Sequence, residues 1–167
     1  MPVLGLCFGG QALAVAAGGS VAASDPPEIG WYEVATSDPA LVPSGPWLHY
    51  HYDQLTPPPN ADVIARAGSG PAAFVLGRSL GLQFHPESTA EIGAAWARMD
   101  AAQRTERGFG GDGLFDDAPE TARADAMRLF DAWWELAGDP RLTGMGTLSK
   151  IGGAADDGAP SETRRST

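Results

Sequence analysis

Short apolar runs separated by turn-forming residues characterise the first half of the chain. A run of Val and Leu at 2–6 predicts a short buried strand. An Ala- and Leu-rich stretch at 11–17 predicts a helix, and Gly18 and Gly19 then supply the glycine that helix ends favour. We therefore expect the chain to open with a strand, a glycine turn and a helix.

The region 21–84 combines short apolar and aromatic runs with many turn formers, which predicts strands joined by tight connections. In 47–52 large aromatic and histidine side chains alternate, as in a strand with two different faces. The turn formers include Asp25-Pro26-Pro27, Asp38-Pro39 and Pro57-Pro58-Pro59. The expected strands are 30–35, 47–52, 62–67, 72–76 and 80–84.

The second half of the chain has the 3.6-residue periodicity of amphipathic helices. Ser88 and Glu91 fit a capping box, and the helix that they open is expected to run to about Gln103. A longer helix is expected over 120–136. The predicted apolar stripes are Ile92, Ala95, Trp96 and Met99 in the first helix and Ala126, Leu129, Phe130, Trp133 and Leu136 in the second.

Length, composition and charge limit the possible functions. The chain has 167 residues, 43% of them hydrophobic, which is enough for one packed domain; we expect it over 1–151, with a disordered tail at 152–167. The formal net charge of −10 disfavours binding to nucleic acid or to an anionic membrane surface. No apolar run approaches the roughly 18 residues of a membrane span. With a single cysteine and no recognisable signal peptide, a cytoplasmic protein is expected.

The single cysteine lies in the motif G-L-C-F-G-G-Q at 5–11, between the predicted strand and helix. This is the arrangement of a nucleophile elbow with cysteine in place of serine. Gly5 and Gly9, two residues either side of Cys7, are expected to let strand and helix approach closely. The helix N-terminus favours a thiolate on Cys7, and the N–H of Phe8 is available to an oxyanion.

A second motif, G-L-Q-F-H-P-E at 81–87, follows the last predicted strand. The strand delivers His85 at its end, and Glu87 follows two residues later. A catalytic histidine needs a third group that holds its tautomer and orientation. Cys7, His85 and Glu87 are therefore the predicted nucleophile, base and orienting carboxylate.

Together, G-x-C-x-G-x-Q and Q-F-H-P-E resemble the class I (triad-type) glutamine amidotransferases, in detail their stand-alone GMP-synthase-like branch. The segments E-I-G-W at 28–31 and W-L-H-Y-H-Y-D at 47–53 add to this likeness. The resemblance covers 2–87 well and the closing helices loosely. It implies an α/β fold with a mostly parallel, doubly wound sheet, here lacking its first βα units.

The resemblance also implies a reaction: hydrolysis of the glutamine side-chain amide through a γ-glutamyl thioester on Cys7, with ammonia delivered to an acceptor. Gln11 matches the family glutamine that lines the substrate pocket. His51 and Tyr52 match a segment that flanks the bound glutamine, and the Phe8 N–H would share the oxyanion with a second backbone N–H. No cofactor or metal is implied. No synthetase domain or ATP loop is visible, so a synthetase or acceptor subunit would be a separate chain.

The chain departs from the family pattern at its beginning, because the elbow normally follows earlier βα units. At about 30 residues per βαβ unit, several dozen residues are missing, including the glycine loop that supplies the second oxyanion donor. The strand at 2–6 would then have an open edge, which favours pairing with another chain. A start assigned too late and a true fragment both explain this, and we favour the late start.

Other interpretations of the same triad stay open. The triad also serves γ-glutamyl peptidases and hydrolases, which cut a γ-glutamyl bond without ammonia transfer. A truncated chain could instead be an inactive binding or regulatory module. Taken singly, Cys7 would be a structural cysteine, His85 a hydrogen-bonded histidine and Glu87 an acid at a helix start.

A metal site is a rival hypothesis for the strand at 47–52. Alternation puts His49, His51 and Asp53 on one face, a pattern typical of metallo-hydrolases. Gln54, however, occupies the position at which that motif carries a further histidine. The glycine-rich segment 108–113 is not followed by Gly-Lys-Ser/Thr, so a surface loop is expected there rather than a phosphate-binding loop.

Overall fold

A five-stranded sheet, a two-stranded ribbon and four helices make up the part of the chain that the computed structural model describes, residues 1–109, 113–116 and 118–139. The sheet has the order β1-β7-β6-β5-β3, with bounds Leu4–Leu6, Ser79–Leu82, Gly70–Leu76, Asp62–Ala67 and Ala35–Thr36. The ribbon pairs β2 (Ser20–Tyr32) with β4 (Trp47–Thr56). The helices are α1 (Phe8–Ala16), α2 (Ala90–Met99), α3 (Ala101–Glu106) and α4 (Ala122–Gly138).

The α/β class predicted from the sequence is confirmed. Strands β1 and β7 run parallel, with Leu6 opposite Leu82. The pairs β7–β6, β6–β5 and β5–β3 run antiparallel. The tight connections explain this, since a two-residue turn such as Gly77-Arg78 joins antiparallel neighbours, whereas a parallel pair needs a long crossover.

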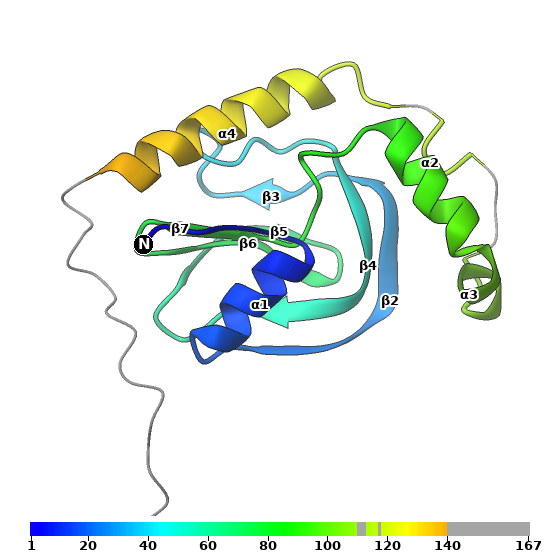
Figure 1. The fold of residues 1–167 in the computed structure, drawn as a ribbon, viewed down its shortest axis with the longest axis horizontal. Coiled ribbons are helices and arrows are strands. Elements are labelled where there is room, and N and C mark those ends of the chain that lie inside the picture. The colour runs from blue at the N-terminus through cyan, green and yellow to red at the C-terminus, as the bar shows by residue number, and fades with distance from the viewer. Residues whose placement is uncertain (110–112, 117, 140–167) are drawn as a thin grey trace, which may run out of the picture.

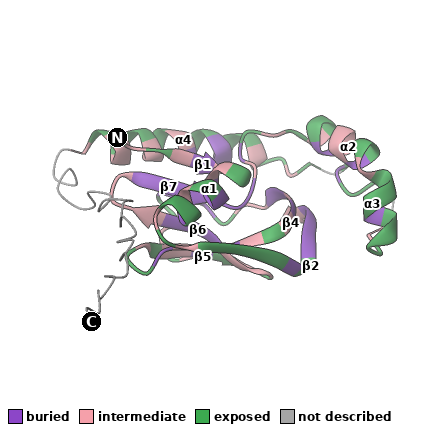
Figure 2. Ribbon diagram, turned by 60° about the horizontal axis from the view of Figure 1, so that its bottom comes forward, coloured by how far each residue is buried: buried purple, intermediate pink, exposed green. Residues whose placement is uncertain are grey.

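The two faces of the sheet pack against different helices, as residues 73–75 of β6 show. Ala73 and Val75 join the core cluster that includes Leu129 of α4. Phe74, on the other face, packs with Ala14 of α1. Figure 1 shows α4 running along one side of the sheet and α1 lying on the other, and Figure 2 shows buried stretches on β7 and β6 of the sheet and on the ribbon strands β2 and β4. The end of β7 is thereby held next to the start of α1.

The length of β2 corrects one prediction. Asp25-Pro26-Pro27 predicts a turn and the strand was expected only at 30–35, but β2 extends through these prolines. Its ladder to β4 shifts register between Ala23 and Glu28, so the prolines occupy an irregularity in which they need not donate ladder hydrogen bonds. The sequence alone does not show that a partner strand accommodates this bulge.

The buried face of α2 also differs from the prediction. Ile92 and Met99 of the expected stripe are exposed, whereas Gly93 and Ala97 are buried. The reason is close packing, because a Cβ on Gly93 would lie 2.7 Å from a ring carbon of Phe115. The helix is capped by Thr89, whose side chain accepts from the Ile92 N–H, instead of by Ser88.

The predicted stripe of α4 is confirmed. Ala126 and Leu129 are buried in the main core, and Phe130, Trp133 and Leu136 pack against it. Among the residues described, no helix has both the length and the apolar character needed to cross a membrane. The predicted tail at 152–167, and the last part of the expected domain, lie outside the described residues.

Candidate active site

Cys7 occupies the sharp turn between β1 and α1. Its φ of 44° and ψ of −102° lie outside the conformations that L-residues favour. Among the described residues it is the one non-glycine residue with a positive φ. Its carbonyl accepts the N–H of Gln11 at 2.9 Å, which begins the helix directly after the strained residue. Strain of this kind persists at functional sites because the surrounding structure enforces it.

Two glycines around the elbow are required by close packing. A Cβ on Gly5 would lie 2.5 Å from the carbonyl oxygen of Gly9, so the predicted role of Gly5 is supported. A Cβ on Gly9 would meet nothing within 4 Å, so the close approach of strand and helix does not depend on a glycine at this position. Gly10 is required instead, since its Cβ would lie 2.3 Å from the carbonyl oxygen of Leu82 in β7.

The structure brings the three predicted catalytic side chains together. His85 follows β7, and its backbone N–H donates to the Leu48 carbonyl of β4 at 2.8 Å. Its Nδ1 lies 2.6 Å from Oε1 of Glu87, and the Cys7 side chain is near enough to its ring to raise the pKa of the imidazole. Because Nδ1 is engaged by Glu87, Nε2 is the nitrogen available to the sulfur. The sequence motifs are thus adjacent in space as expected.

The electrostatics of this group favour a protonated imidazole. Burial lowers the pKa of His85, but hydrogen bonds to Cys7 and Glu87 and the charges of both groups outweigh it and raise the pKa to about 9. Burial raises the pKa of Glu87, yet the hydrogen bond and charge of His85 reverse this and lower it overall. The imidazole therefore carries its proton at neutral pH, next to a sulfur and an ionised carboxylate.

Three further groups surround the Cys7–His85 pair without having been predicted. The Trp96 ring packs on His85 with the centroids 4.8 Å apart. The Cys7 Sγ lies 3.9 Å from the Tyr50 carbonyl oxygen, and Nε2 of Gln83 lies 3.8 Å from the same sulfur. For Gln83 a signal existed, because residues two apart in an extended chain share a face, and Gln83 precedes His85 by two.

The predicted substrate-binding residues have different surroundings. Phe8 is exposed at the first turn of α1, where backbone N–H groups have no intrahelical acceptor. The Gln11 amide donates to the Asp53 carbonyl at 2.9 Å, which joins α1 to β4. His51 is buried against Glu28, as described below, and the Tyr52 hydroxyl donates to Asp100 at 2.5 Å. Substrate binding by these side chains stays a prediction.

The histidines of β4 form a buried cluster with Glu28 of β2. Oε2 of Glu28 lies 2.8 Å from His49 Nδ1 and 3.1 Å from His51 Nε2, and its Oε1 accepts the Ser69 N–H at 2.7 Å. The three side chains are close enough to hold a metal ion, and Asp53, the third ligand suggested by the sequence, is not among them. This cluster is therefore the place where the rival metal hypothesis would put the ion.

A hydrogen-bond network explains this cluster better than a metal site. A metal would take the lone pairs of His49 Nδ1 and His51 Nε2, which would move each ring proton to the other nitrogen. Those nitrogens are buried and have no hydrogen-bond partner among the described residues, whereas metal-bound histidines normally donate their second N–H. With the ring protons on His49 Nδ1 and His51 Nε2, both rings donate to Glu28 and neither leaves a buried N–H without an acceptor.

The pKa shifts in the Glu28 cluster agree with this assignment. Burial lowers the pKa of His49, and the opposing hydrogen bond to Glu28 does not overcome it. Burial raises the pKa of Glu28, but donors from His49, His51 and Ser69 outweigh it and lower the pKa overall. The cluster is therefore a buried, ionised carboxylate that accepts hydrogen bonds from His49, His51 and the Ser69 N–H.

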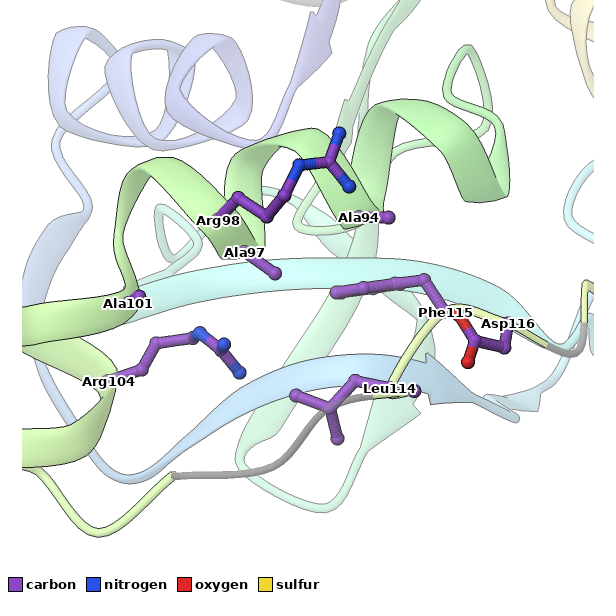
Figure 3. A pocket seen from close by; sticks show the side chains of 9 residues that line it. Ala94, Ala97, Arg98, Ala101, Arg104, Leu114, Phe115 and Asp116 are labelled. Atoms are coloured by element: carbon purple, nitrogen blue, oxygen red, sulfur yellow. The ribbon is translucent and has the colours of Figure 1, made fainter.

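A separate pocket of about 280 Å³ lies beside α2 and α3 (Figure 3). Ala97, Arg98 and Arg104 line it from the helices, and Leu114 and Phe115 from the segment that follows. Cys7, His85 and Glu87 are not part of its lining. The pocket is thus distinct from the candidate active site, which lies at the junction of α1, β4 and the end of β7.

Comparisons with known proteins agree with this geometry. A family model described as "Glutamine amidotransferase class-I" matches residues 1–97. The glutamine-hydrolyzing GMP synthase of Aeropyrum pernix is 36% identical over 119 residues, which are 64% of this chain and 23% of that protein. One subunit of the glutamine-hydrolyzing GMP synthase of Ignicoccus hospitalis is 36% identical over 95 residues, 52% of this chain and 50% of that one.

Solved structures show the same fold. A glutamine amidotransferase of Thermotoga maritima superposes with a TM-score of 0.67 at 26% identity, covering 83% of this chain and 63% of that one. A glutamine amidotransferase of Methylobacillus flagellatus gives a TM-score of 0.69 at 24% identity, over 81% and 63% of the two chains. This chain thus spans between 23% and 63% of the length of these four proteins.

Proposed function

Because this chain belongs to the class-I glutamine amidotransferase family, we propose that it hydrolyses the side-chain amide of glutamine with Cys7, His85 and Glu87 as its catalytic triad. The observation that carries this proposal is the strained Cys7, whose side chain lies beside an imidazole that Glu87 holds at 2.6 Å. Nucleophile, base and orienting group are the three parts that acyl transfer by a thiol requires.

In the first half of the reaction, the Cys7 thiolate attacks the amide carbon of the substrate and forms a C–S bond. The protonated His85 then gives its proton to the nitrogen of the collapsing intermediate. The C–N bond breaks, and ammonia leaves a γ-glutamyl thioester on Cys7. The raised pKa of His85, about 9, supports this assignment because the imidazole enters the reaction already protonated.

In the second half, the neutral His85 takes a proton from water, and the resulting hydroxide attacks the thioester carbon. The C–S bond breaks, glutamate leaves, and the thiolate–imidazolium pair is restored. Glu87 fixes the Nδ1–H tautomer throughout, which keeps Nε2 directed at the reacting groups. The free N–H of Phe8, at the start of α1, donates to the oxyanion in both halves.

Gln11 would border the glutamine site, since its amide is fixed to the Asp53 carbonyl directly after the elbow. We further propose that the ammonia passes to an acceptor on a separate synthetase chain. In support, one relative is named as a single subunit of a GMP synthase, a name that implies a second subunit of that enzyme. The domain assignment 1–151, the absence of a required cofactor and a cytoplasmic location remain part of the same proposal.

Labelling with an electrophilic glutamine analogue, such as a chloroketone, tests the proposal on the 167-residue chain. Mass spectrometry should find one adduct, on Cys7, and excess glutamine should prevent it. Cys7→Ala should give no adduct and should reduce ammonia release from glutamine to background, a loss of about 10⁴-fold or more. Gly9→Ala, which places a methyl group in open space on the same turn, is the matched folding control.

Two results would contradict the proposal in different ways. Labelling that is slow and indifferent to glutamine would favour an inactive binding or regulatory module. Faster cleavage of γ-glutamyl dipeptides than of glutamine, with the Cys7 adduct intact, would favour a γ-glutamyl peptidase or hydrolase. In that second case the triad would stand and only the substrate would change.

A further inference from the structure

Gln83 is a buried amide that contacts the nucleophile directly. It is 1% exposed and lies between the elbow and β4. The parallel register explains its position: Leu6 of β1 is opposite Leu82 of β7, so the next residues along the two strands, Cys7 and Gln83, are neighbours. Its Nε2 lies 3.8 Å from the Cys7 Sγ.

The orientation of this amide is fixed by a backbone group. The N–H of Leu55 in β4 donates to Oε1 of Gln83 at 3.0 Å. A flipped amide would place two N–H donors against that N–H, so the oxygen must face Leu55 and the nitrogen must face the sulfur. The Gln83 side chain can therefore offer the sulfur only a donor.

The Cys7 sulfur has one backbone contact and one contact with the Gln83 side chain, and each contact suits a different protonation state of Cys7. A thiol can donate its proton to the Tyr50 carbonyl, 3.9 Å away. A thiolate has no proton to donate and needs donors, of which the imidazolium of His85 is one and the Gln83 amide is the other. When Cys7 ionises, its sulfur therefore gives up the hydrogen bond to the Tyr50 carbonyl and accepts one from the Gln83 amide, without any movement of these groups.

We propose that Gln83 is a catalytic residue that stabilises the Cys7 thiolate by donating its Nε2–H to the sulfur, alongside His85. The inference deepens the proposed function, because it names a fourth group acting on the same nucleophile. It rests on the contact and on the fixed orientation of the amide. A buried amide nitrogen also needs an acceptor, and the anionic sulfur is a stronger one than the neutral thiol.

Substitutions can separate this role from a structural one. Gln83→Glu keeps an oxygen that accepts the Leu55 N–H but replaces the donor facing Cys7 with a second oxygen. Gln83→Met keeps most of the volume and removes both hydrogen bonds. Gln103→Met changes an exposed glutamine on α3 and serves as the matched control. If Gln83 only ties β7 to β4, the Met variant should lose stability but keep the Cys7 reactivity of the unchanged protein, since methionine adds no charge beside the sulfur.

The readout is the rate at which iodoacetamide alkylates Cys7, which is the single cysteine of the chain and hence the single thiol measured. The rate at pH 7 is divided by the rate of the same variant at pH 10, which corrects for differences in access to the sulfur. Loss of the donor should lower this ratio about tenfold in Gln83→Met and at least as much in Gln83→Glu. Gln103→Met should leave it unchanged.

A ratio in Gln83→Met equal to that of the unchanged protein would overturn the proposal. If a variant does not fold, the Gln83 side-chain NH₂ signals of the unchanged protein, labelled with ¹⁵N, decide the matter. They should shift as Cys7 ionises and stay constant in Cys7→Ala; signals that ignore the ionisation would refute the contact. Alkylation needs no glutamine, so this result stands or falls separately from glutaminase activity.

Discussion

The molecule contains two carboxylate–imidazole pairs of similar length that behave in opposite ways. His85 and Glu87 are 2.6 Å apart, with 14% and 38% of their side chains exposed. His49 and Glu28 are 2.8 Å apart, with 0% and 5% exposed. The pKa of His85 is raised to about 9, whereas the pKa of His49 is lowered.

The difference shows that a carboxylate partner alone does not keep an imidazole protonated. In both pairs burial opposes the charged ring and the carboxylate favours it. At His49 burial prevails, and the nearby His51 adds to it. At His85 the Cys7 sulfur supplies a second hydrogen bond and a second charge, which reverses the balance. The Cys7 sulfur therefore distinguishes the candidate active site from the His49–Glu28 pair.

The largest predicted effect is a difference between Glu28 and Glu87 in how much each contributes to the stability of the fold. Glu28→Ala should lower the free energy of unfolding by about 2–5 kcal/mol, because His49 and His51 would each keep a buried N–H, and Ser69 a half-buried one, without its acceptor. Glu87→Ala should cost less than about 1 kcal/mol, since that side chain is partly exposed. Urea denaturation of both variants measures the difference, and equal losses would remove the distinction between the pairs.

The second effect is a dependence on pH that belongs to His85. Its folded pKa of about 9 lies above the ordinary value of 6.5. Its contribution to stability is therefore complete below about pH 6.5 and disappears as the pH rises through about 9, a loss of about 1–3 kcal/mol. In NMR, the His85 ring signals should titrate near pH 9, and Cys7→Ala should bring the midpoint down. A midpoint unaffected by Cys7→Ala would show that the sulfur is not the cause.

The smallest effect tests the backbone packing that holds His85 and Cys7 together. Gly10→Ala should destabilise the fold by about 1–3 kcal/mol, because the new methyl would collide with the Leu82 carbonyl next to the second motif. Gly9→Ala should be neutral or stabilising by up to about 1 kcal/mol, since its methyl meets nothing and alanine favours helix. Thermal unfolding of this adjacent pair gives the comparison, and equal losses would contradict the packing argument.

Much of the fold was accessible from the sequence because local patterns specify it. The strand expected at 62–67 coincides with β5, and the helix expected at 120–136 lies two residues from the bounds of α4 at each end. Both elements have clear periodicity and clear stops. The two motifs also predicted that Cys7, His85 and Glu87 would meet, and the structure places them together, while their catalytic roles remain to be measured.

The features that sequence reasoning missed depend on partners far away in the chain. The bulge in β2 exists because β4 tolerates it, and the buried face of α2 follows from contacts of Gly93 with Phe115 and Leu48. The Glu28 cluster needs the register between β2 and β4, which places Glu28 opposite His51. Gln83 reaches Cys7 only because β7 lies parallel beside β1. The local periodicity of the sequence does not reveal such pairings.

Strand β4 contributes to the elbow through its main chain, with the Tyr50 carbonyl beside the Cys7 sulfur and the Asp53 carbonyl on the Gln11 amide. A carbonyl is present whatever side chain its residue has. Diverged members of a protein family could therefore replace the outward residues of this strand and still keep the same acceptors. A search for similar catalytic centres by side-chain identity along this strand would overlook them, whereas a search by backbone geometry would find them.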